Sequence, residues 1–469
     1  MLRSLFLAAV LPLAPVIATA APLDPSAIKR IDTDVQTVLE RSGAPSAVIA
    51  VVDDGRIVYR KAYGLRDRER RLAATVDTHY EIGSITKQFT AAAILQLQQA
   101  GKLSIDDKLS KYLPDAPHAD EVTLRQLLSH TSGLPEYLDA MEEEHTIDKP
   151  ARFDQLIAHV AGKPLDFTPG SRWSYSNTGY ALLGRLIETV SQESYRHYVQ
   201  THLLDPAGMT KTYTVADEWR LANKALGYRR NNGQIERAPT IADSVGWAAG
   251  FLVSTVDDVQ KWNAALEHGR IVTPENYALM GTSVRTTDGD DTGYGFGLFV
   301  DSLNDQPRIG HTGGTLGFTT ANEYFPKQNL HIIAFTNLRT DPRPGETIAN
   351  AVFDDLFPEI TAAAAKPAPG EDGDATAKAK ALFAEFQSGA ESSPLLGAKL
   401  DTKMKAGLAK RLTALFAPYG APTRFVYKGS RPGADCRWHD YVIEFGPGSR
   451  LKFSIALGDE KKIVSISYG

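Results

Sequence analysis

A serine and a lysine that could act as a nucleophile and its base stand three residues apart at the start of an apolar run. In EIGSITKQFTAAAILQLQQAGKL, residues 81–103, Ser84 and Lys87 follow Gly83 where the pattern predicts the opening of a buried helix. The first N–H groups of a helix have no partner within it, so the Ser84 N–H could stabilise an oxyanion. Lys87, one turn on, would lie on the same face, and burial would lower its pKa enough for it to accept the serine proton.

The Ser-x-x-Lys spacing alone is weak evidence, because it occurs three times in this chain. Ser26 and Lys29 begin an earlier predicted helix with no glycine-rich or Tyr/Asn motif nearby. Ser449 and Lys452 lie in a strand-like run, where side chains three apart point to opposite faces. The alternative for Ser84 itself is an ordinary helix cap beside a solvated lysine.

A second motif, Tyr175-Ser176-Asn177, is the one Tyr-x-Asn of the chain and precedes another helical run. A phenol such as Tyr175 can pass a proton between a serine and a leaving group. The Asn177 amide can orient both Lys87 and a substrate carbonyl. The alternative is a capped helix start with a packed tyrosine.

A third motif, His311-Thr312-Gly313-Gly314, follows a possible strand end and precedes the strand-like FTTANEYF. Glycines allow the backbone to approach a ligand closely, and the Gly314 N–H could be a second oxyanion donor. The alternative is a tight turn carrying a surface histidine.

In this order and at these separations, SITK, YSN and HTG resemble the three motifs of the serine β-lactamase and penicillin-binding-protein superfamily. The branch is the one with class C β-lactamases, D-alanyl-D-alanine carboxypeptidases, D-aminopeptidases and related esterases. The resemblance covers about residues 25–358, and its further carriers are LLSHTSGLPEY (127–137), GWAAGFLVSTVDDVQKW (246–262) and YGFGLFV (294–300).

The resemblance implies a role for each motif residue. Ser84 would be the acylated nucleophile, and Lys87 and Tyr175 would share the acid/base work. The residues that would position substrate are Asn177, His311 and Thr312, with His311 on an edge strand, and the oxyanion hole would be the backbone N–H groups of Ser84 and Gly314.

One departure bears on the substrate. Class C β-lactamases carry a lysine where this chain has His311, and imidazole suits a substrate carboxylate less well than a permanent ammonium. We therefore expect an exported serine hydrolase, with D-amino-acid peptidase or amidase slightly ahead of esterase and with β-lactamase as an alternative. A penicillin-binding or cell-wall sensor without turnover is the alternative from another class, although the intact Ser84, Lys87, Tyr175 and Asn177 argue against it.

The element pattern predicts an α/β (α+β) domain over residues 21–360. Strand-like runs occur near both of its ends, with a mainly helical region between, so one antiparallel sheet built from both ends, flanked by helices and carrying a helical insertion, is the economical arrangement. The catalytic site would lie at the seam. The expected elements are a helix over 26–43, a hairpin over 47–64, helices across 84–285, strands at 294–300, 318–325 and 331–337, and a helix over 346–356.

After this domain, residues 361–379 are rich in Ala, Pro, Gly and charge and predict a linker. Residues 380–469 then predict a small α+β accessory domain of two helices and four strands without a catalytic cluster. Its role is open from the sequence.

Composition and termini limit the other possibilities. With 469 residues and a net charge of -5, the chain has no basic field for nucleic acid or an anionic membrane. Residues 1–20 read as a signal peptide cleaved after Ala20, which predicts a periplasmic or secreted protein without a stable membrane anchor. No metal or cofactor motif occurs, and Cys436 is the single cysteine. The expected partner is a small-molecule or peptide substrate, cell-wall-derived ones included, and the oligomeric state cannot be read.

Overall fold

The central sheet joins the two ends of the main domain. In the computed structural model, which describes residues 23–231 and 233–468, β1 (Ser46–Asp53) pairs antiparallel with β12 (Leu330–Thr336), so that Ala50 lies opposite Ile333. The predicted signal peptide, residues 1–20, lies outside the described residues. Pairing of strands so distant in sequence confirms that one sheet is built from both ends of this domain.

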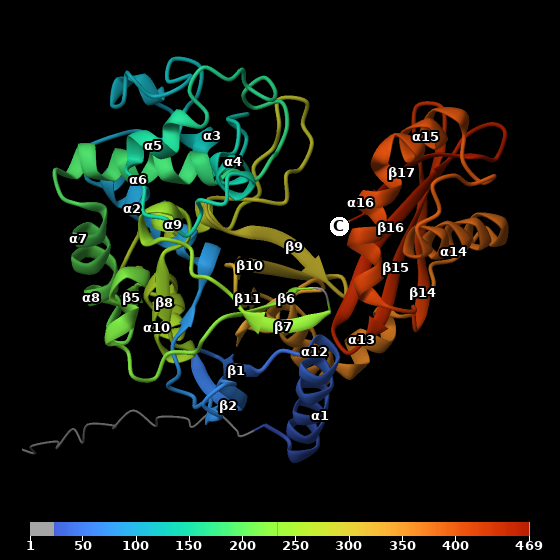
Figure 1. The fold of residues 1–469 in the computed structure, drawn as a ribbon, viewed down its shortest axis with the longest axis horizontal. Coiled ribbons are helices and arrows are strands. Elements are labelled where there is room, and N and C mark those ends of the chain that lie inside the picture. The colour runs from blue at the N-terminus through green and yellow to red at the C-terminus, as the bar shows by residue number, and fades with distance from the viewer. Residues whose placement is uncertain (1–22, 232, 469) are drawn as a thin grey trace, which may run out of the picture.

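Within the described residues this sheet has seven strands, with antiparallel pairing throughout (Figure 1). In sheet order the remaining strands flank the central pair: β3 (Leu72–Ala73), β2 (Arg56–Asp67), β1, β12, β11 (Thr319–Phe325), β10 (Gln306–Gly314) and β9 (Phe299–Leu303). YGFGLFV was predicted as a strand over 294–300, but the strand begins only at Phe299. Gly297, in the left-handed region at φ 73°, turns the chain just before it.

Both faces of the sheet are covered. Alternate residues of β1 enter two separate cores, with Ile49 and Val51 in one and Val48 and Ala50 in the other. The first core is closed by α1 (Pro25–Ser42) and α12 (Pro344–Leu356), whose apolar residues recur at helical spacing. The second core is closed by the helical insertion. The buried sheet therefore lies between two layers of helices.

The insertion is built around α2 (Thr86–Gln99), which is buried along nearly its whole length. Its other helices within the described residues are α3 (Leu124–Leu128), α4 (Tyr137–Glu143), α5 (Phe153–Ala158), α6 (Asn177–Ser191), α7 (Tyr195–Val199), α8 (Asp205–Ala207), α9 (Asp243–Gly250), α10 (Val256–Glu267) and α11 (Pro274–Met280). Two small sheets complete the domain: β4 (Tyr80–Glu81), β8 (Leu252–Ser254) and β5 (Tyr213–Thr214), then β13 (Leu338–Arg339), β6 (Tyr228–Asn231) and β7 (Gln234–Arg237).

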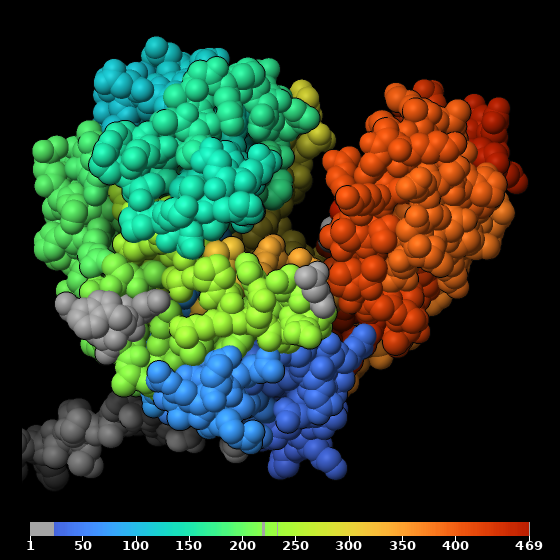
Figure 2. Space-filling model, viewed as in Figure 1, coloured from blue at the N-terminus to red at the C-terminus, as the bar shows by residue number. Residues whose placement is uncertain are grey.

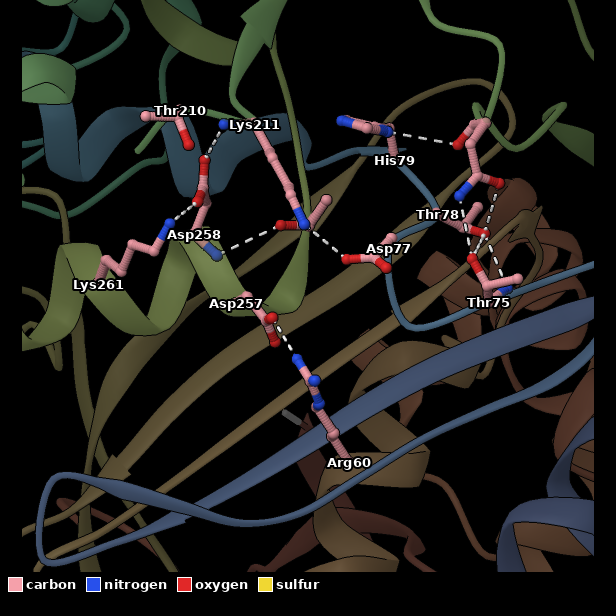
Figure 3. Close-up of polar contacts among 12 residues, drawn as sticks. Arg60, Thr75, Asp77, Thr78, His79, Thr210, Lys211, Asp257, Asp258 and Lys261 are labelled. Atoms are coloured by element: carbon pink, nitrogen blue, oxygen red, sulfur yellow. Dashed lines mark hydrogen bonds and ion pairs between the residues drawn. The ribbon is translucent and has the colours of Figure 1, made fainter. Parts of the chain in front are cut away.

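A group of charged side chains ties the insertion to the sheet (Figure 3). Asp258 of α10 accepts a hydrogen bond from the Lys211 N–H at 2.6 Å and one from the Lys261 ammonium at 2.7 Å. The Lys211 ammonium donates to Asp77 at 2.6 Å, in the segment that leads from the sheet to α2. These bonds connect three segments that are far apart in the sequence.

The C-terminal domain is a separate α+β unit with its own core, as the sequence predicts (Figure 1). Its antiparallel sheet runs β14 (Arg424–Pro432), β15 (Arg437–Gly446), β16 (Ser449–Leu457) and β17 (Ile463–Tyr468), and its helices are α14 (Gly373–Ser388), α15 (Ala398–Lys403) and α16 (Ala409–Phe416). The segment predicted as a linker, 361–379, is shorter in the structure. It begins inside α13 (Pro358–Ala364), and α14 already starts at Gly373, where the Asp372 carboxylate caps the helix.

The C-terminal domain docks on α12 through a tight turn. A Cβ atom on Gly448 would lie 2.0 Å from the Thr347 carbonyl oxygen, so only glycine allows this approach. Arg450 forms an ion pair with Asp354 of α12. Above this contact a notch separates the C-terminal domain, orange to red, from the teal helices of the insertion (Figure 2). No helix within residues 23–231 and 233–468 combines the length and apolar character required to span a bilayer.

Candidate active site

Ser84 lies where the insertion meets the sheet. It occupies a single 3-10 turn, Gly83–Ile85, and so it lies two residues before α2 begins at Thr86 and not within the α-helix. Gly83 has a φ of 53°, and a Cβ atom there would lie 2.8 Å from the Gly314 nitrogen at the end of β10. Glycine at this position lets the Ser84 turn touch the strand that carries the third motif.

Lys87 is fully buried and directed at Ser84. Its Nζ donates to the Ser84 Oγ at 3.2 Å, to the Asn177 Oδ1 at 2.8 Å and to the Ala249 carbonyl oxygen at 3.0 Å. Burial lowers the pKa of Lys87 to about 7, although the Glu136 carboxylate opposes this by favouring the charged form. A lysine poised near neutral pH can take a proton from the serine and return it.

Asn177 is the first residue of α6, and Ser176 caps that helix by accepting from the Gly179 N–H. The Asn177 N–H donates in turn to the Glu136 carboxylate, the residue that precedes α4. Because Glu136 fixes the backbone and Lys87 binds the side chain, the Asn177 amide is held in one orientation.

A kinked helix supplies the third partner of Lys87. Trp247 has a φ of 29° and a ψ of -127° inside α9, a conformation that L-residues rarely adopt. Beyond this kink the Ala248 carbonyl accepts from Thr90 Oγ1 at 2.6 Å, and the Ala249 carbonyl accepts from Lys87. Sequence reasoning missed this contribution, because neither alanine has a functional side chain.

Tyr175 lies over Lys87, with the Lys87 Nζ 4.7 Å from the centre of the phenol ring. Burial raises the pKa of Tyr175 above its ordinary value, and the nearby Ser84 hydroxyl lowers it by less. The Tyr175 hydroxyl is buried and has no partner in hydrogen-bonding geometry among the described residues. It is therefore a protonated phenol that can donate to a ligand bound at Ser84.

His311 lies within β10 and not in a turn beyond a strand end, which corrects the sequence-based alternative of a surface histidine. It is 1% exposed, and burial lowers its pKa to about 3. Its Nδ1 lies 2.6 Å from the Thr312 carbonyl oxygen, and its Nε2 lies 2.9 Å from the Tyr294 hydroxyl. Because a carbonyl only accepts, the Nδ1 carries the hydrogen, and His311 is a neutral group with both nitrogens occupied.

The rest of the third motif is open on one side. β9 pairs with β10 only from Gln306 to Gly310, whereas β11 continues to pair up to Gly314. The stretch from His311 to Gly314 therefore presents an open strand edge next to Ser84, although β10 is not the outermost strand of the sheet. A Cβ atom on Gly313 would lie 2.0 Å from the Ile82 carbonyl oxygen, which explains the glycine.

The structure thus joins three predicted residues, Ser84, Lys87 and Asn177, by hydrogen bonds. Tyr175 and His311 lie beside them, with ring centres 6.1 Å apart. Thr312 is half-buried on β10, and among the described residues no hydrogen bond links its hydroxyl to the group around Ser84.

His130 is a further residue that the sequence reasoning did not single out. It is 1% exposed, its ring centre lies 4.3 Å from that of Tyr175, and its Nδ1 accepts from the Ser176 N–H at 3.1 Å. Its Nε2 is buried without a partner among the described residues, and burial lowers its pKa well below the ordinary value. The sequence signal for it is the segment LLSHTSGLPEY, which the family resemblance includes without giving His130 a role.

Metal chemistry has no evident ligand set here. Across 23–231 and 233–468, no group of three or more His, Cys, Asp or Glu side chains is arranged to hold a metal ion.

Comparison with known proteins places the site in a family context. Residues 31–356 match the protein family described as Beta-lactamase. Protein flp of Staphylococcus aureus (strain MW2) is 28% identical over 327 residues, which are 67% of this chain and 64% of flp, so the chain spans less than two thirds of that relative.

Two solved structures extend the comparison. A D-stereospecific amidohydrolase from Streptomyces sp. is 27% identical with a TM-score of 0.60, over 70% of this chain and 98% of that one. The octameric penicillin-binding protein homologue from Pyrococcus abyssi shares the fold at 23% identity and a TM-score of 0.63, over 92% of this chain and 96% of that one.

Proposed function

The chain belongs to the Beta-lactamase family and is a serine hydrolase of that fold, and we propose that it acts through a covalent acyl-enzyme on Ser84. One observation carries the proposal. The buried Lys87 ammonium lies 3.2 Å from the Ser84 Oγ, and burial brings its pKa to about 7. Near neutral pH a substantial fraction of this lysine is an unprotonated amine, which the serine hydroxyl needs as a base.

In the first step, neutral Lys87 takes the Ser84 hydroxyl proton as Oγ bonds to the substrate carbonyl carbon. The carbonyl oxygen becomes an oxyanion, and the Ser84 and Gly314 N–H groups are the proposed donors to it. Within the described chain no backbone hydrogen bond beyond the regular ladders engages the Ser84 N–H, which leaves it available.

In the second step the leaving group departs with a proton. Tyr175 is suited to donate that proton, because its raised pKa keeps the phenol protonated and its hydroxyl has no other partner within the described residues. Protonated Lys87 then restores the Tyr175 proton. Water reverses the sequence by attacking the acyl carbon, so that Ser84 is released and the acid product leaves.

We further propose a D-amino-acid amide or peptide as substrate, with esters as the weaker option. The similarity to the D-stereospecific amidohydrolase from Streptomyces sp. supports this class. The neutral His311 supports it too, because an uncharged imidazole with both nitrogens occupied supplies no cation at the third-motif position, where class C β-lactamases carry a lysine. Export, with cleavage after Ala20, is part of the proposal and accounts for residues 1–20.

A substrate panel tests this function. Purified protein would be given the amides of D-alanine and L-alanine, a D-alanyl-D-alanine peptide, a chromogenic ester and a chromogenic β-lactam, with the Ser84→Ala protein as control. We expect hydrolysis of the D-alanine compounds at least about tenfold faster than of L-alanine amide, a difference of about 1.4 kcal/mol in the barrier. Equal turnover of both enantiomers would contradict the substrate class, and turnover by Ser84→Ala would contradict the mechanism.

A further inference from the structure

A cleft of about 750 Å³ lies between the main domain and the C-terminal domain. The main-domain wall includes Arg41 at the end of α1, Arg230 of β6 and Arg339 of β13. The facing wall comes from the C-terminal domain and includes Tyr419 and Ser449. Two domains with separate cores thus share one hollow.

The lining of this cleft carries three arginines and one carboxylate. Among the described residues, Arg230 donates to the Ser42 and Gly233 carbonyl oxygens and to no carboxylate. Arg41 and Arg339 make no hydrogen bond or ion pair with any described residue. The single acidic group of the lining, Asp341, is exposed and already lies 3.8 Å from Arg343. The Asp341 and Glu142 carboxylates act on Arg339 without bonding to it, and guanidinium groups that bond to no carboxylate favour an anionic ligand.

A second hollow of about 510 Å³ between the same domains shows the opposite pattern. There Arg308 pairs with Asp301 at 2.6 Å, Lys428 with Asp305 at 3.2 Å, and Arg431 with Asp440 at 3.3 Å. The domain interface can therefore pair its charges internally, and the arginine-lined cleft is an exception to that pattern.

One lining residue, Arg339, connects the arginine-lined cleft to the reaction site. A Cβ atom on Gly314 would lie 2.6 Å from the Arg339 Nη1, so this guanidinium lies against the backbone of the proposed oxyanion residue. A ligand whose carbonyl is bound at Ser84 would thus have Arg339 beside its next residue, with Arg230 and Arg41 further along.

The wall from the C-terminal domain also has an unused polar group. Ser449 is 8% exposed, and its buried hydroxyl has no hydrogen-bond partner among the described residues. A buried hydroxyl without a partner is costly, and rotation of the Ser449 side chain toward the cleft would let a carboxylate there satisfy it.

We propose that this cleft binds the carboxylates of an acidic peptide substrate and that the C-terminal domain is one wall of the substrate site. Arg339 would hold the carboxylate nearest the scissile bond, and Arg230, Arg41 and Ser449 would hold the next. The proposal rests on the proposed function for the position of the scissile bond, and it narrows the substrate class from D-amino-acid peptides to acidic ones.

Binding to the full-length Ser84→Ala protein tests this without any need for turnover. The probes are D-Ala-D-Glu-D-Glu and a counterpart of similar shape that has no carboxylate, D-Ala-D-Gln-D-Gln amide, measured by titration calorimetry at low and high salt. We expect the acidic peptide to bind at least about tenfold more tightly at low salt, and the preference to shrink at high salt because exposed charges are screened.

Further substitutions in the Ser84→Ala background test which residues of the arginine-lined cleft contact the acidic peptide. Arg339→Gln and Ser449→Ala should each reduce the preference for the acidic peptide severalfold, as measured by the ratio of its affinity to that of the peptide without carboxylates. Arg431→Gln, which removes a paired arginine from the second hollow, should leave the preference intact, and circular dichroism checks that each variant is folded.

Equal affinity for the two peptides would overturn the cleft proposal, as would an equal loss of preference in Arg431→Gln and Arg339→Gln. Selective binding of the acidic peptide would support the cleft even if the wild-type protein hydrolysed none of the panel, and that result would overturn only the proposed function. Hydrolysis of the panel by the wild-type protein, without any preference for the acidic peptide, would overturn the cleft proposal and support the proposed function.

Discussion

The region around Ser84 and the core of the C-terminal domain bury very different side chains. Around Ser84 the buried groups are polar, and Lys87, Tyr175 and His311 have pKa values displaced by burial. In the C-terminal domain the centre is Phe383, with ring centres of Phe416, Phe445 and Phe453 at 5.1, 5.8 and 5.6 Å.

This difference indicates that the region around Ser84 carries the reaction, whereas the core of the C-terminal domain stabilises the fold. Burying polar groups costs stability, and buried groups with displaced pKa values cluster at functional sites. The packed phenylalanine rings give the C-terminal domain a stable core of its own, and that core holds a wall next to the site. The following changes should affect one region and not the other.

Ser84→Ala should have the largest effect, because it removes the nucleophile. Turnover should fall at least about 10⁴-fold, while the free energy of unfolding changes by about 1 kcal/mol or less. The measurement is steady-state hydrolysis together with urea unfolding. Ser26→Ala, in the exposed Ser-x-x-Lys of α1, is the matched control and should be fully active.

Lys87→Met should reduce turnover about 10³-fold by removing the base. In the wild type the neutral amine is the active form, so kcat/KM should rise as the pH increases through about 7, the pKa of Lys87. The variant should lose this rise. A pH profile that is flat between 6 and 8 in the wild type, or unchanged by the substitution, would remove Lys87 from the mechanism, and Lys29→Met serves as control.

Phe383→Ala addresses the other region. Removing a ring that is 1% exposed should lower the free energy of unfolding of the C-terminal domain by about 3 to 5 kcal/mol. Hydrolysis of a small neutral ester should be unchanged at temperatures where the domain remains folded. Loss of ester hydrolysis in step with the loss of stability would show that the two regions are not separable.

His311→Gln should have the smallest effect, on the pH dependence of stability. The folded pKa of His311 is about 3, whereas an unfolded histidine titrates near 6.5. Below pH 6.5 the unfolded chain gains a proton that the folded one does not, so stability falls between pH 7 and pH 5 by about 2 kcal/mol for this group. Chemical unfolding at both pH values should show a smaller fall in His311→Gln, and the exposed His268→Gln should behave as the wild type.

Local patterns in the sequence predicted much of the fold. The spacing of Ile31 and Val35 predicted α1, and Asp54-Gly55 predicted the β1–β2 hairpin. The return of strands after a helical region predicted one sheet from both ends. The predictions of α1 and of the hairpin depend only on neighbouring residues. The prediction of one sheet depends on the number of strands that would otherwise have no partner.

The parts that could not be predicted depend on contacts between distant residues. The Ala249 carbonyl reaches Lys87 because of the kink at Trp247, and the kink has no local signal. Arg339 lies beside Gly314 only because β13 follows the central strand, and nothing in the two segments indicates it. The motifs identified the nucleophile and its neighbours, whereas the cleft required the arrangement of two domains.

The central claim is that Ser84 carries the acyl group, and the most direct test is to trap it. The wild-type protein would be incubated with a fluorescent penicillin, and the labelled peptide would be located by mass spectrometry after digestion. The account predicts one adduct on the peptide that contains Ser84, absent from Ser84→Ala and formed much more slowly by Lys87→Met. An adduct on any other residue, or substrate turnover by a protein in which Ser84 cannot be acylated, would contradict it.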